Sequence, residues 1–158
     1  MLLTGEYELT LDEKNRLSIP ARIRDQVPRE DSEKGFYQVL GVNRVLCLYP
    51  DLYYERIALA VAPRRVAPDE LLTFDRINCA LAGKVELDRQ GRVLLNDKAV
   101  RRAGLKEQVT LIGARDHLEI WDRGQWEKFL EQHLETHEQM LLQAWEEALR
   151  REREMAGR

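Results

Sequence analysis

Two copies of the motif Asp-x-x-x-Arg lie in this chain, and each places a carboxylate four residues before a guanidinium. The first copy runs from Asp12 to Arg16 and the second from Asp88 to Arg92. An arginine can neutralise phosphates or pair with the O6 and N7 atoms of guanine. An aspartate repels phosphate but commonly fixes a turn. The two motifs therefore predict two turns, held by their aspartates, whose arginines could bind a nucleic acid.

Further basic residues surround each motif, although the whole chain has a net charge of −3. Residues 12–24 hold four basic and two acidic side chains, a net of +2. Residues 88–102 hold five basic and two acidic side chains, a net of +3. Two basic patches in an acidic protein favour a nucleic-acid surface. The candidate DNA-binding residues are Arg16, Arg92, Lys14, Arg89, Arg22 and Arg24. The alternative is that each arginine only stabilises its own turn by pairing with the aspartate.

The residues inside each motif suit a tight turn between two strands. Gly91 readily adopts a positive φ, and Asn15 tolerates it better than most residues. Leu9 and Leu11 alternate with polar residues before the first turn, which is the period of a strand. The turn-stabilising residues are therefore expected to be Asp12, Asp88, Asn15 and Gly91.

A second block also occurs twice, so the chain consists of two similar halves. Leu46-x-Leu48-Tyr49 corresponds to Leu118-x-Ile120-Trp121. Each half predicts a strand, a turn, a second strand, a short basic segment, a strand pair and a helix. One half is too small to bury its apolar faces alone. We therefore expect the halves to pair about a pseudo-twofold axis.

The elements around the two halves complete the expected organisation. Pro68, acids in the following turn and spaced apolar residues predict a connecting helix near Pro68–Leu81. Apolar residues at three- and four-residue steps predict a helical tail whose stripe must pack on something. The predicted divisions are a first repeat with its helix at 1–62, a connecting helix at 63–81, a second repeat at 82–130 and a C-terminal helical tail at 131–158.

The two motifs with their flanks resemble the signatures of MraZ proteins. Leu11–Arg24 is similar to the first-repeat signature and Ala82–Leu95 to the second, and Val109–Gly113 strengthens the match. The resemblance implies an α+β fold of two AbrB-like (SpoVT-AbrB) swapped-hairpin repeats, with a pseudo-twofold β-barrel core, peripheral helices and a C-terminal helical tail. Asn15 departs from the usual Gly, and Asn96-Asp97 replaces a stretch that usually contains Pro.

The same resemblance implies a function and a partner. MraZ-type proteins are transcriptional regulators that bind direct-repeat boxes upstream of the division and cell-wall gene cluster. Their DNA-binding arginines correspond to Arg16 and Arg92 here. The implied partners are double-stranded DNA and further copies of the same chain, in a ring-shaped homo-oligomer such as an octamer or dodecamer. The implied location is the cytoplasm, at the nucleoid.

Other function classes fit the residues less well. Asp12 and Asp88 could form an aspartic-protease dyad, but the neighbouring charged side chains crowd both carboxylates. His133 and His137 lie four residues apart, yet no third ligand is evident, so no metal site and no cofactor are expected. A scaffold that assembles without DNA stays open. Cys47 and Cys79 are expected to be buried thiols, and no apolar stretch is long enough for a membrane span.

Overall fold

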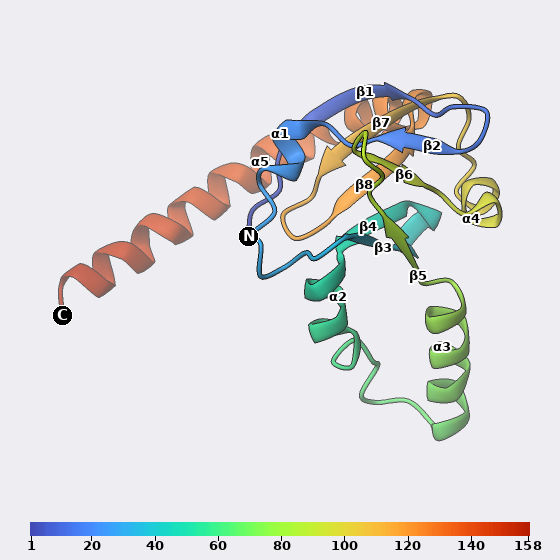
Figure 1. Cartoon of the computed structure of the whole chain (residues 1–158). Helices are drawn as coiled ribbons and strands as arrows, with labels where there is room; N and C mark the ends of the chain where they lie inside the picture. The colour runs from blue at the N-terminus through green and yellow to red at the C-terminus, as the bar shows by residue number, and fades with distance from the viewer. The chain divides into compact units, whose positions relative to one another are not determined.

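The computed structural model describes all residues, 1–158, and has an α+β fold. Two compact units make up the chain, Met1–Arg123 and Gly124–Arg158, and each is described by itself. The first unit holds every β-strand and the four shorter α-helices, and the second is helical (Figure 1).

Six strands form one antiparallel sheet in the first unit. Their order is β1 (Glu6–Thr10), β7 (Gln108–Gly113), β8 (Leu118–Asp122), β4 (Leu46–Pro50), β3 (Gly35–Leu40) and β5 (Gly83–Glu86). The first strand of each half pairs with the hairpin of the other half: β1 with β7, and β5 with β3. The halves therefore exchange strands, and neither could complete this sheet alone.

The register at the centre of the sheet joins equivalent positions of the two halves. Strand β4 pairs with β8 so that Cys47 lies opposite Glu119. Leu46 lies opposite Ile120, and all the flanking leucines and isoleucines of this pair are fully buried. These side chains place the middle of the core on β4 and β8, where the two halves meet.

A separate two-stranded ribbon packs its apolar side into the same core. It consists of β2 (Arg16–Ser18) and β6 (Arg92–Leu94), paired antiparallel with Leu17 opposite Val93. Both of these side chains are fully buried, whereas Ser18 and Leu94 are exposed. Because side chains alternate along a strand, the ribbon has one buried face and one outer face.

The expected β-barrel core is not found as a closed barrel, because the sheet is open. A barrel needs every strand to be paired on both sides. Here β1 and β5 are the two edges of the sheet and do not pair with each other. After each turn the chain leaves the sheet, and the three-residue strands β2 and β6 pair only with each other. The ribbon therefore does not bridge the edges. The pseudo-twofold relation of the halves stays a prediction.

Short helices connect the strands of the first unit. They are α1 (Ala21–Arg24), the 3-10 turn η1 (Val42–Arg44), α2 (Asp51–Ala58), α3 (Pro68–Ala80) and α4 (Asp97–Arg102). Asn96 caps α4, because its side chain accepts hydrogen bonds from the backbone N–H groups of Lys98 and Ala99. Asn96 thus starts this helix, whereas Pro20 precedes α1.

Asp51 is the first residue of α2, and its side chain reaches beyond this helix. Its buried carboxylate accepts hydrogen bonds from the backbone N–H groups of Glu33 (2.8 Å), Lys34 (3.1 Å) and Leu52 (3.0 Å). Two of these donors belong to the loop before β3. Asp51 therefore fixes the entry of that strand.

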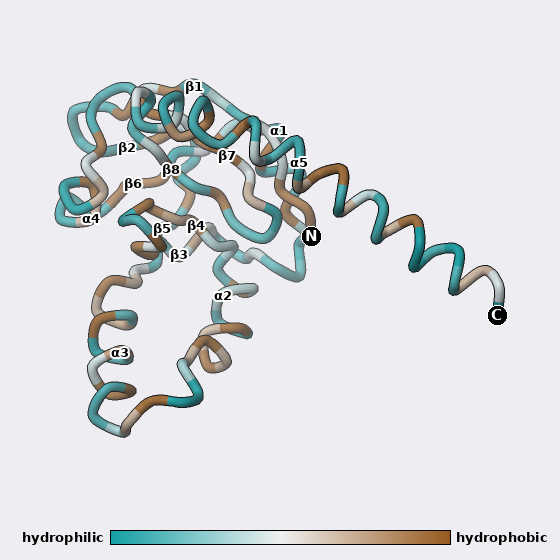
Figure 2. The backbone as a smooth tube through the Cα atoms, turned by 180° about the vertical axis from the view of Figure 1, so that it is seen from behind, coloured by the Kyte–Doolittle hydropathy of each residue, from teal (hydrophilic) through white to brown (hydrophobic).

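Helix α5 (Arg123–Ala156) accounts for nearly all of the second unit. Figure 2 shows hydrophobic and hydrophilic residues recurring in turn along it. Trp145 is 61% exposed and Leu149 46% exposed, so the single chain does not cover this apolar stripe. No helix in the structure combines the length and the apolar character needed to cross a membrane.

Only one of the two cysteines has the burial expected for it. Cys47 lies buried on β4, whereas Cys79 is exposed. Cys79 lies on α3, a helix without any buried residue, so its apolar sequence neighbours do not enclose it. Both thiols are free of disulfides.

Candidate nucleic-acid interface

The first Asp-x-x-x-Arg motif forms a compact hydrogen-bonded turn. Asp12 Oδ1 accepts hydrogen bonds from the backbone N–H of Lys14 at 2.9 Å and of Arg16 at 2.8 Å. Asp12 Oδ2 accepts a third from Arg16 Nε at 2.7 Å. Asn15 has a φ of 59°, in the left-handed region that closes the turn.

The second motif repeats this arrangement atom for atom. Asp88 Oδ1 accepts from the backbone N–H of Gln90 at 2.8 Å and of Arg92 at 3.0 Å, and Oδ2 accepts from Arg92 Nε at 2.9 Å. Gly91 has a φ of 75° at the position equivalent to Asn15. Both aspartates therefore orient the arginine of their own turn.

These bonds make an aspartic dyad a poor description of Asp12 and Asp88. The backbone N–H of Arg16 is the main cause that lowers the pKa of Asp12. Burial opposes it, and the Arg16 guanidinium and the backbone N–H of Lys14 lower the pKa further. Arg92 lowers the pKa of Asp88 in the same way. A dyad requires two close carboxyls that share a proton. Here each carboxylate is ionised and bonded within its own turn.

The ribbon brings the two motif arginines onto one surface. Ser18 lies opposite Arg92, and Arg16 lies opposite Leu94. Residues directly opposite, or two apart along a strand, share a face of the ribbon. All four residues thus lie on the outer face, and the Arg16 and Arg92 side chains are 34% and 27% exposed. Only Nε of each guanidinium bonds its aspartate, so both terminal nitrogens can bind an external acceptor.

Each turn also contacts the short helix of the other half. Asn15 Nδ2 donates to Asp97 Oδ1 on α4 at 3.1 Å. The Arg24 side chain lies over Gly91, since a Cβ atom at Gly91 would be 2.9 Å from Arg24 Cζ. Arg24 Nε donates to the carbonyl of Ile19 at 3.1 Å. Arg24 is therefore positioned against the second turn, although it is far from that turn in sequence.

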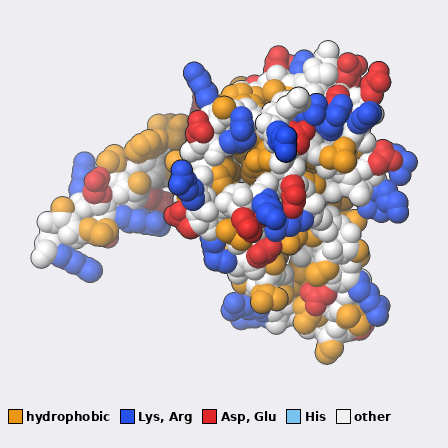
Figure 3. All heavy atoms as spheres, viewed as in Figure 1, with side chains coloured by type: hydrophobic (Ala, Val, Ile, Leu, Met, Phe, Trp, Pro, Cys, Tyr) orange, Lys and Arg blue, Asp and Glu red, His pale blue; other side chains and the backbone are white.

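The remaining candidate residues are exposed. Lys14 and Arg89 lie inside the two turns, and Arg22 lies on α1. The exposed basic residues of α4 extend the positive surface: Lys98, Arg101 and Arg102. Figure 3 shows Lys and Arg side chains gathered over β2 and α4, with fewer acidic side chains between them. The structure thus places Arg16, Arg92, Lys14 and Arg89 on the ribbon and its turns and Arg24 against the second turn, whereas Arg22 lies on α1.

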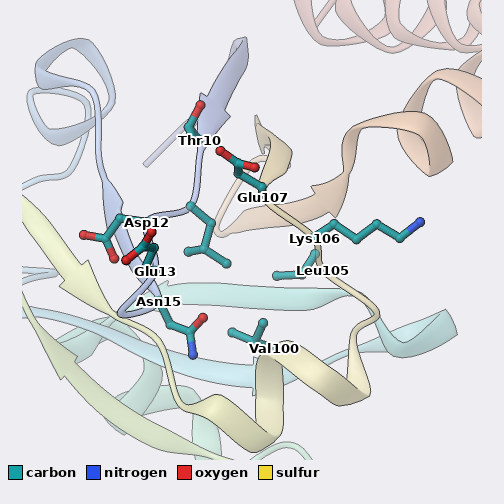
Figure 4. Close-up of a pocket in the computed structure, with 9 residues that line it drawn as sticks. Thr10, Asp12, Glu13, Asn15, Val100, Leu105, Lys106 and Glu107 are labelled. Atoms are coloured by element: carbon teal, nitrogen blue, oxygen red, sulfur yellow. The ribbon is translucent and has the colours of Figure 1, made fainter.

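A cavity of about 560 Å³ lies beside the first turn (Figure 4). Asp12, Glu13 and Asn15 line it from the turn, and Val100 lines it from α4. Glu107 adds a third carboxylate. Lys106 also lines the cavity, but three carboxylates against one ammonium group disfavour phosphate. The outer face of the ribbon is therefore the better candidate for DNA contact.

Sequence reasoning missed two sets of residues. Leu94 is 60% exposed beside Arg16 on the outer face of the ribbon, although an apolar residue in a strand usually signals core. A second cluster joins Cys47, His117 and Glu119, whose ligand atoms all lie within 4.8 Å of one another. Only the cross-strand register of β4 and β8 reveals this proximity.

The histidine of the second cluster has unusual surroundings. Burial favours neutral His117, but hydrogen bonding to Cys47, Glu119 and Asp116 outweighs burial and raises the pKa of His117 to about 10. The ring also stacks on Tyr49, with 4.7 Å between the ring centroids. Burial is the main cause that raises the pKa of Tyr49 to about 12.

Comparisons with known proteins agree with the repeated architecture. The family described as "MraZ protein, putative antitoxin-like" matches the chain twice, over residues 2–73 and 80–151. A protein of Roseiflexus castenholzii named transcriptional regulator MraZ is 33% identical over 82% of this chain and 87% of its own length. The protein of the same name from Heliobacterium modesticaldum is 30% identical over 88% of this chain and 94% of its own length.

A third relative, from Nocardia farcinica, carries the same name and is 32% identical over 87% of this chain and 93% of its own length. Each family match contains one Asp-x-x-x-Arg turn and one hairpin of the six-stranded sheet. The matches thus divide the chain into the same two halves that exchange strands in the structure. On this evidence, the chain belongs to the MraZ family.

Proposed function

We propose that this protein is a sequence-specific DNA-binding transcriptional regulator that contacts DNA with the outer face of the β2–β6 ribbon. One observation carries the proposal: the ribbon holds Arg16 and Arg92 on a single exposed face, each oriented by its own aspartate. A two-stranded ribbon fits the major groove, where an arginine can pair bidentately with guanine O6 and N7. The relatives named transcriptional regulators support the same function.

The surrounding basic residues have a different role in this proposal. Lys14 and Arg89 contact phosphates beside the turns, and Arg22 and Arg24 extend these contacts from α1. Phosphate contacts fix the position of a protein on the duplex without reading its sequence. The target, by family resemblance, is a set of direct-repeat boxes upstream of the division and cell-wall gene cluster. The protein acts in the cytoplasm, at the nucleoid.

The proposal includes a ring-shaped homo-oligomer, such as an octamer or dodecamer. Seven large apolar side chains of α5 are exposed in the single chain: Leu134, Met140, Leu141, Leu142, Trp145, Leu149 and Met155. An apolar stripe of this length usually has a partner. Light scattering at micromolar concentration should give a mass larger than a dimer, and a stable monomer would contradict the ring.

The test of DNA binding uses the promoter region upstream of the protein's own gene. Arg16→Ala and Arg92→Ala should each weaken specific binding by about 1–3 kcal/mol, and the double variant should nearly abolish it. Fluorescence anisotropy with excess competitor DNA measures the affinities. Lys14→Ala and Arg89→Ala should weaken binding to all sequences alike and flatten its salt dependence.

Arg64→Ala provides the matched control, because Arg64 is an exposed arginine outside both turns. It should bind the promoter as the wild type does. A folded double variant of Arg16 and Arg92 with wild-type affinity would rule out the ribbon as the contact surface. Assembly without any salt-sensitive DNA affinity would instead favour the scaffold function.

A further inference from the structure

A cluster of metal-ligand side chains lies on the sheet, apart from the two turns. Cys47 on β4 faces Glu119 on β8 across the strand pair, and His117 immediately precedes β8. The Cys47 Sγ atom, a His117 ring nitrogen and a Glu119 carboxylate oxygen all lie within 4.8 Å of one another. A sulfur, a nitrogen and an oxygen donor therefore lie close together, on β4 and at the start of β8.

The distances within the cluster suit a small metal ion with tetrahedral coordination. His117 Nε2 lies 3.2 Å from Glu119 Oε1. Zinc–nitrogen and zinc–oxygen bonds of about 2.0–2.1 Å at a tetrahedral angle place the two donors roughly 3.3 Å apart. A zinc–sulfur bond of about 2.3 Å similarly requires a sulfur–nitrogen separation of roughly 3.6 Å. All three ligand atoms lie within 4.8 Å of one another, so a shift of about 1 Å brings Cys47 Sγ to the required separation.

Neighbouring residues already hold the ligands in suitable orientations. His117 Nδ1 lies 2.8 Å from Asp116 Oδ1, so Nδ1–H donates to this carboxylate. Nε2–H donates to Glu119 Oε1, and a metal ion would displace this proton. Tyr53 donates its hydroxyl to Asp116 Oδ2 at 2.8 Å. Trp121 Nε1–H donates to Glu119 Oε2 at 2.8 Å. A carboxylate behind the histidine, and a fixed second oxygen on the glutamate, are typical of metal sites.

We propose that Cys47, His117 and Glu119 bind one divalent transition-metal ion, with Zn²⁺ as the preferred ion. A set of one sulfur, one nitrogen and one oxygen donor favours Zn²⁺ over the harder Mg²⁺ and Ca²⁺. The side chains of His117 and Glu119 are 17% and 23% exposed, which gives the ion a path of entry. Three protein ligands leave a fourth position for water.

The bound ion would join the two halves of the chain. Its cysteine comes from a strand of the first family match and its other two ligands from the second. Cys47 and Glu119 form the central pair between β4 and β8, the strands at which the halves meet. Because the unfolded chain does not present this ligand set, metal binding stabilises the folded protein.

His133 and His137 on α5 form the alternative site at which an added metal ion could bind. His133 Nδ1 already bonds the backbone carbonyl of Phe129 at 2.7 Å. No third ligand joins His133 and His137 in the structure, whereas the β4–β8 cluster has three. The pair therefore supplies a control within the same chain.

The experiment uses the full chain after treatment with a chelator. Isothermal titration with Zn²⁺ should show one site per chain, and saturation should raise the melting temperature by several degrees. Titration with Co²⁺ should produce the absorption of a thiolate-bound cobalt ion. Cys47→Ser and His117→Gln should abolish these responses, whereas Cys79→Ser and the double variant His133→Ala/His137→Ala should retain them. Asp116→Asn should weaken Zn²⁺ binding by about 10–100-fold.

Circular dichroism checks that each variant folds. If a variant of Cys47 or His117 does not fold, Glu119→Gln is tested in its place. The site would be overturned if the wild type showed no Zn²⁺ binding at tens of micromolar, or if the folded ligand variants bound Zn²⁺ as tightly as the wild type. Loss of binding only in the His133/His137 variant would assign the metal to α5 and likewise overturn it. None of these readouts involves DNA.

Discussion

At the scale of single residues, Arg16 and Arg92 each stabilise their own turn and are the proposed DNA-binding residues. Each uses Nε to bond its aspartate, which restricts the side chain before any partner arrives. The terminal nitrogens keep the planar fork that suits guanine or phosphate. A restricted side chain loses less conformational entropy on binding. The structural role and the proposed DNA-binding role of these arginines are therefore compatible, because the hydrogen bond from Nε would hold the guanidinium in place for the proposed contact.

Alanine substitutions at Gly91 and Gly104 distinguish the effect of losing the Arg24 contact from the effect of backbone strain. Both have a positive φ, 75° and 65°, so an alanine at either position should cost about 1 kcal/mol of unfolding free energy. A Cβ atom at Gly91 would displace the Arg24 guanidinium, whereas nothing lies within 4 Å of one at Gly104. We expect only Gly91→Ala to weaken DNA binding. Urea unfolding and anisotropy measure the two effects, and equal affinities would contradict a role for Arg24.

Asp51 should make the stability of the protein depend on pH in the acidic range. Burial raises the pKa of Asp51, but the backbone N–H groups of Glu33, Lys34 and Leu52 together outweigh burial and lower it. A lowered pKa in the folded state stabilises the protein above the unfolded value of about 4. This contribution is lost as the pH falls through the folded pKa.

Asp51→Asn should therefore reduce the unfolding free energy near neutral pH by about 1–3 kcal/mol, because backbone donors lose their charged acceptor. The variant should also show a shallower loss of stability below about pH 5. Urea unfolding at a series of pH values tests both effects. Asp75→Asn removes an exposed carboxylate on α3 and serves as the control. A variant curve parallel to that of the wild type would show that Asp51 does not cause the dependence.

At the scale of elements, the two faces of the β2–β6 ribbon should respond differently to truncation. Leu17 is fully buried, so Leu17→Ala should cost about 2–5 kcal/mol of stability. Leu94 is 60% exposed on the outer face, so Leu94→Ala should change stability by less than about 0.5 kcal/mol. Because Leu94 lies opposite Arg16, its loss should weaken DNA binding. Thermal unfolding and anisotropy of both variants test this division, and a destabilising Leu94→Ala would contradict it.

The elements also show which parts of the fold can be predicted from local sequence. Strand alternation and the repeated motifs predict β1, β2 and the hairpins, because these signals span only a few residues. The open sheet and the β2–β6 pairing were not predictable, since they depend on which strands meet across the chain. Cys79 is exposed despite apolar neighbours for the same reason. The Cys47–His117–Glu119 cluster needs a register between residues 72 positions apart in sequence, which no local pattern specifies.

At the scale of the whole molecule, the proposed function makes one chain a complete DNA-binding unit, because its two halves interlock. The register of the ribbon pairs Leu17 with Val93, and that of the sheet pairs Cys47 with Glu119. Both are equivalent positions of the two halves. A chain that presents both turns on one ribbon needs no second copy to present a pair of arginines. In the proposed ring, oligomerisation would join several such units.

This arrangement leads to a prediction about the DNA site. Units related by rotation in a ring approach the duplex in the same sense, so they bind direct repeats, whereas a twofold dimer favours an inverted repeat. Ribbons on one face of the duplex need boxes separated by about one helical turn, roughly 10 bp. Each box is bound weakly, and several boxes together are bound tightly through effective concentration.

Insertion of half a turn of DNA between two boxes tests this geometry. The insertion rotates one box to the opposite face of the duplex, so a second ribbon reaches it only by bending or twisting the DNA at a cost of a few kcal/mol. Binding should therefore fall sharply, and a full-turn insertion should restore much of it. Promoter fragments with no insertion, a half turn and a full turn are compared by gel shift. Equal binding to all three would mean that the ribbons act independently, even if every single-box contact is as proposed.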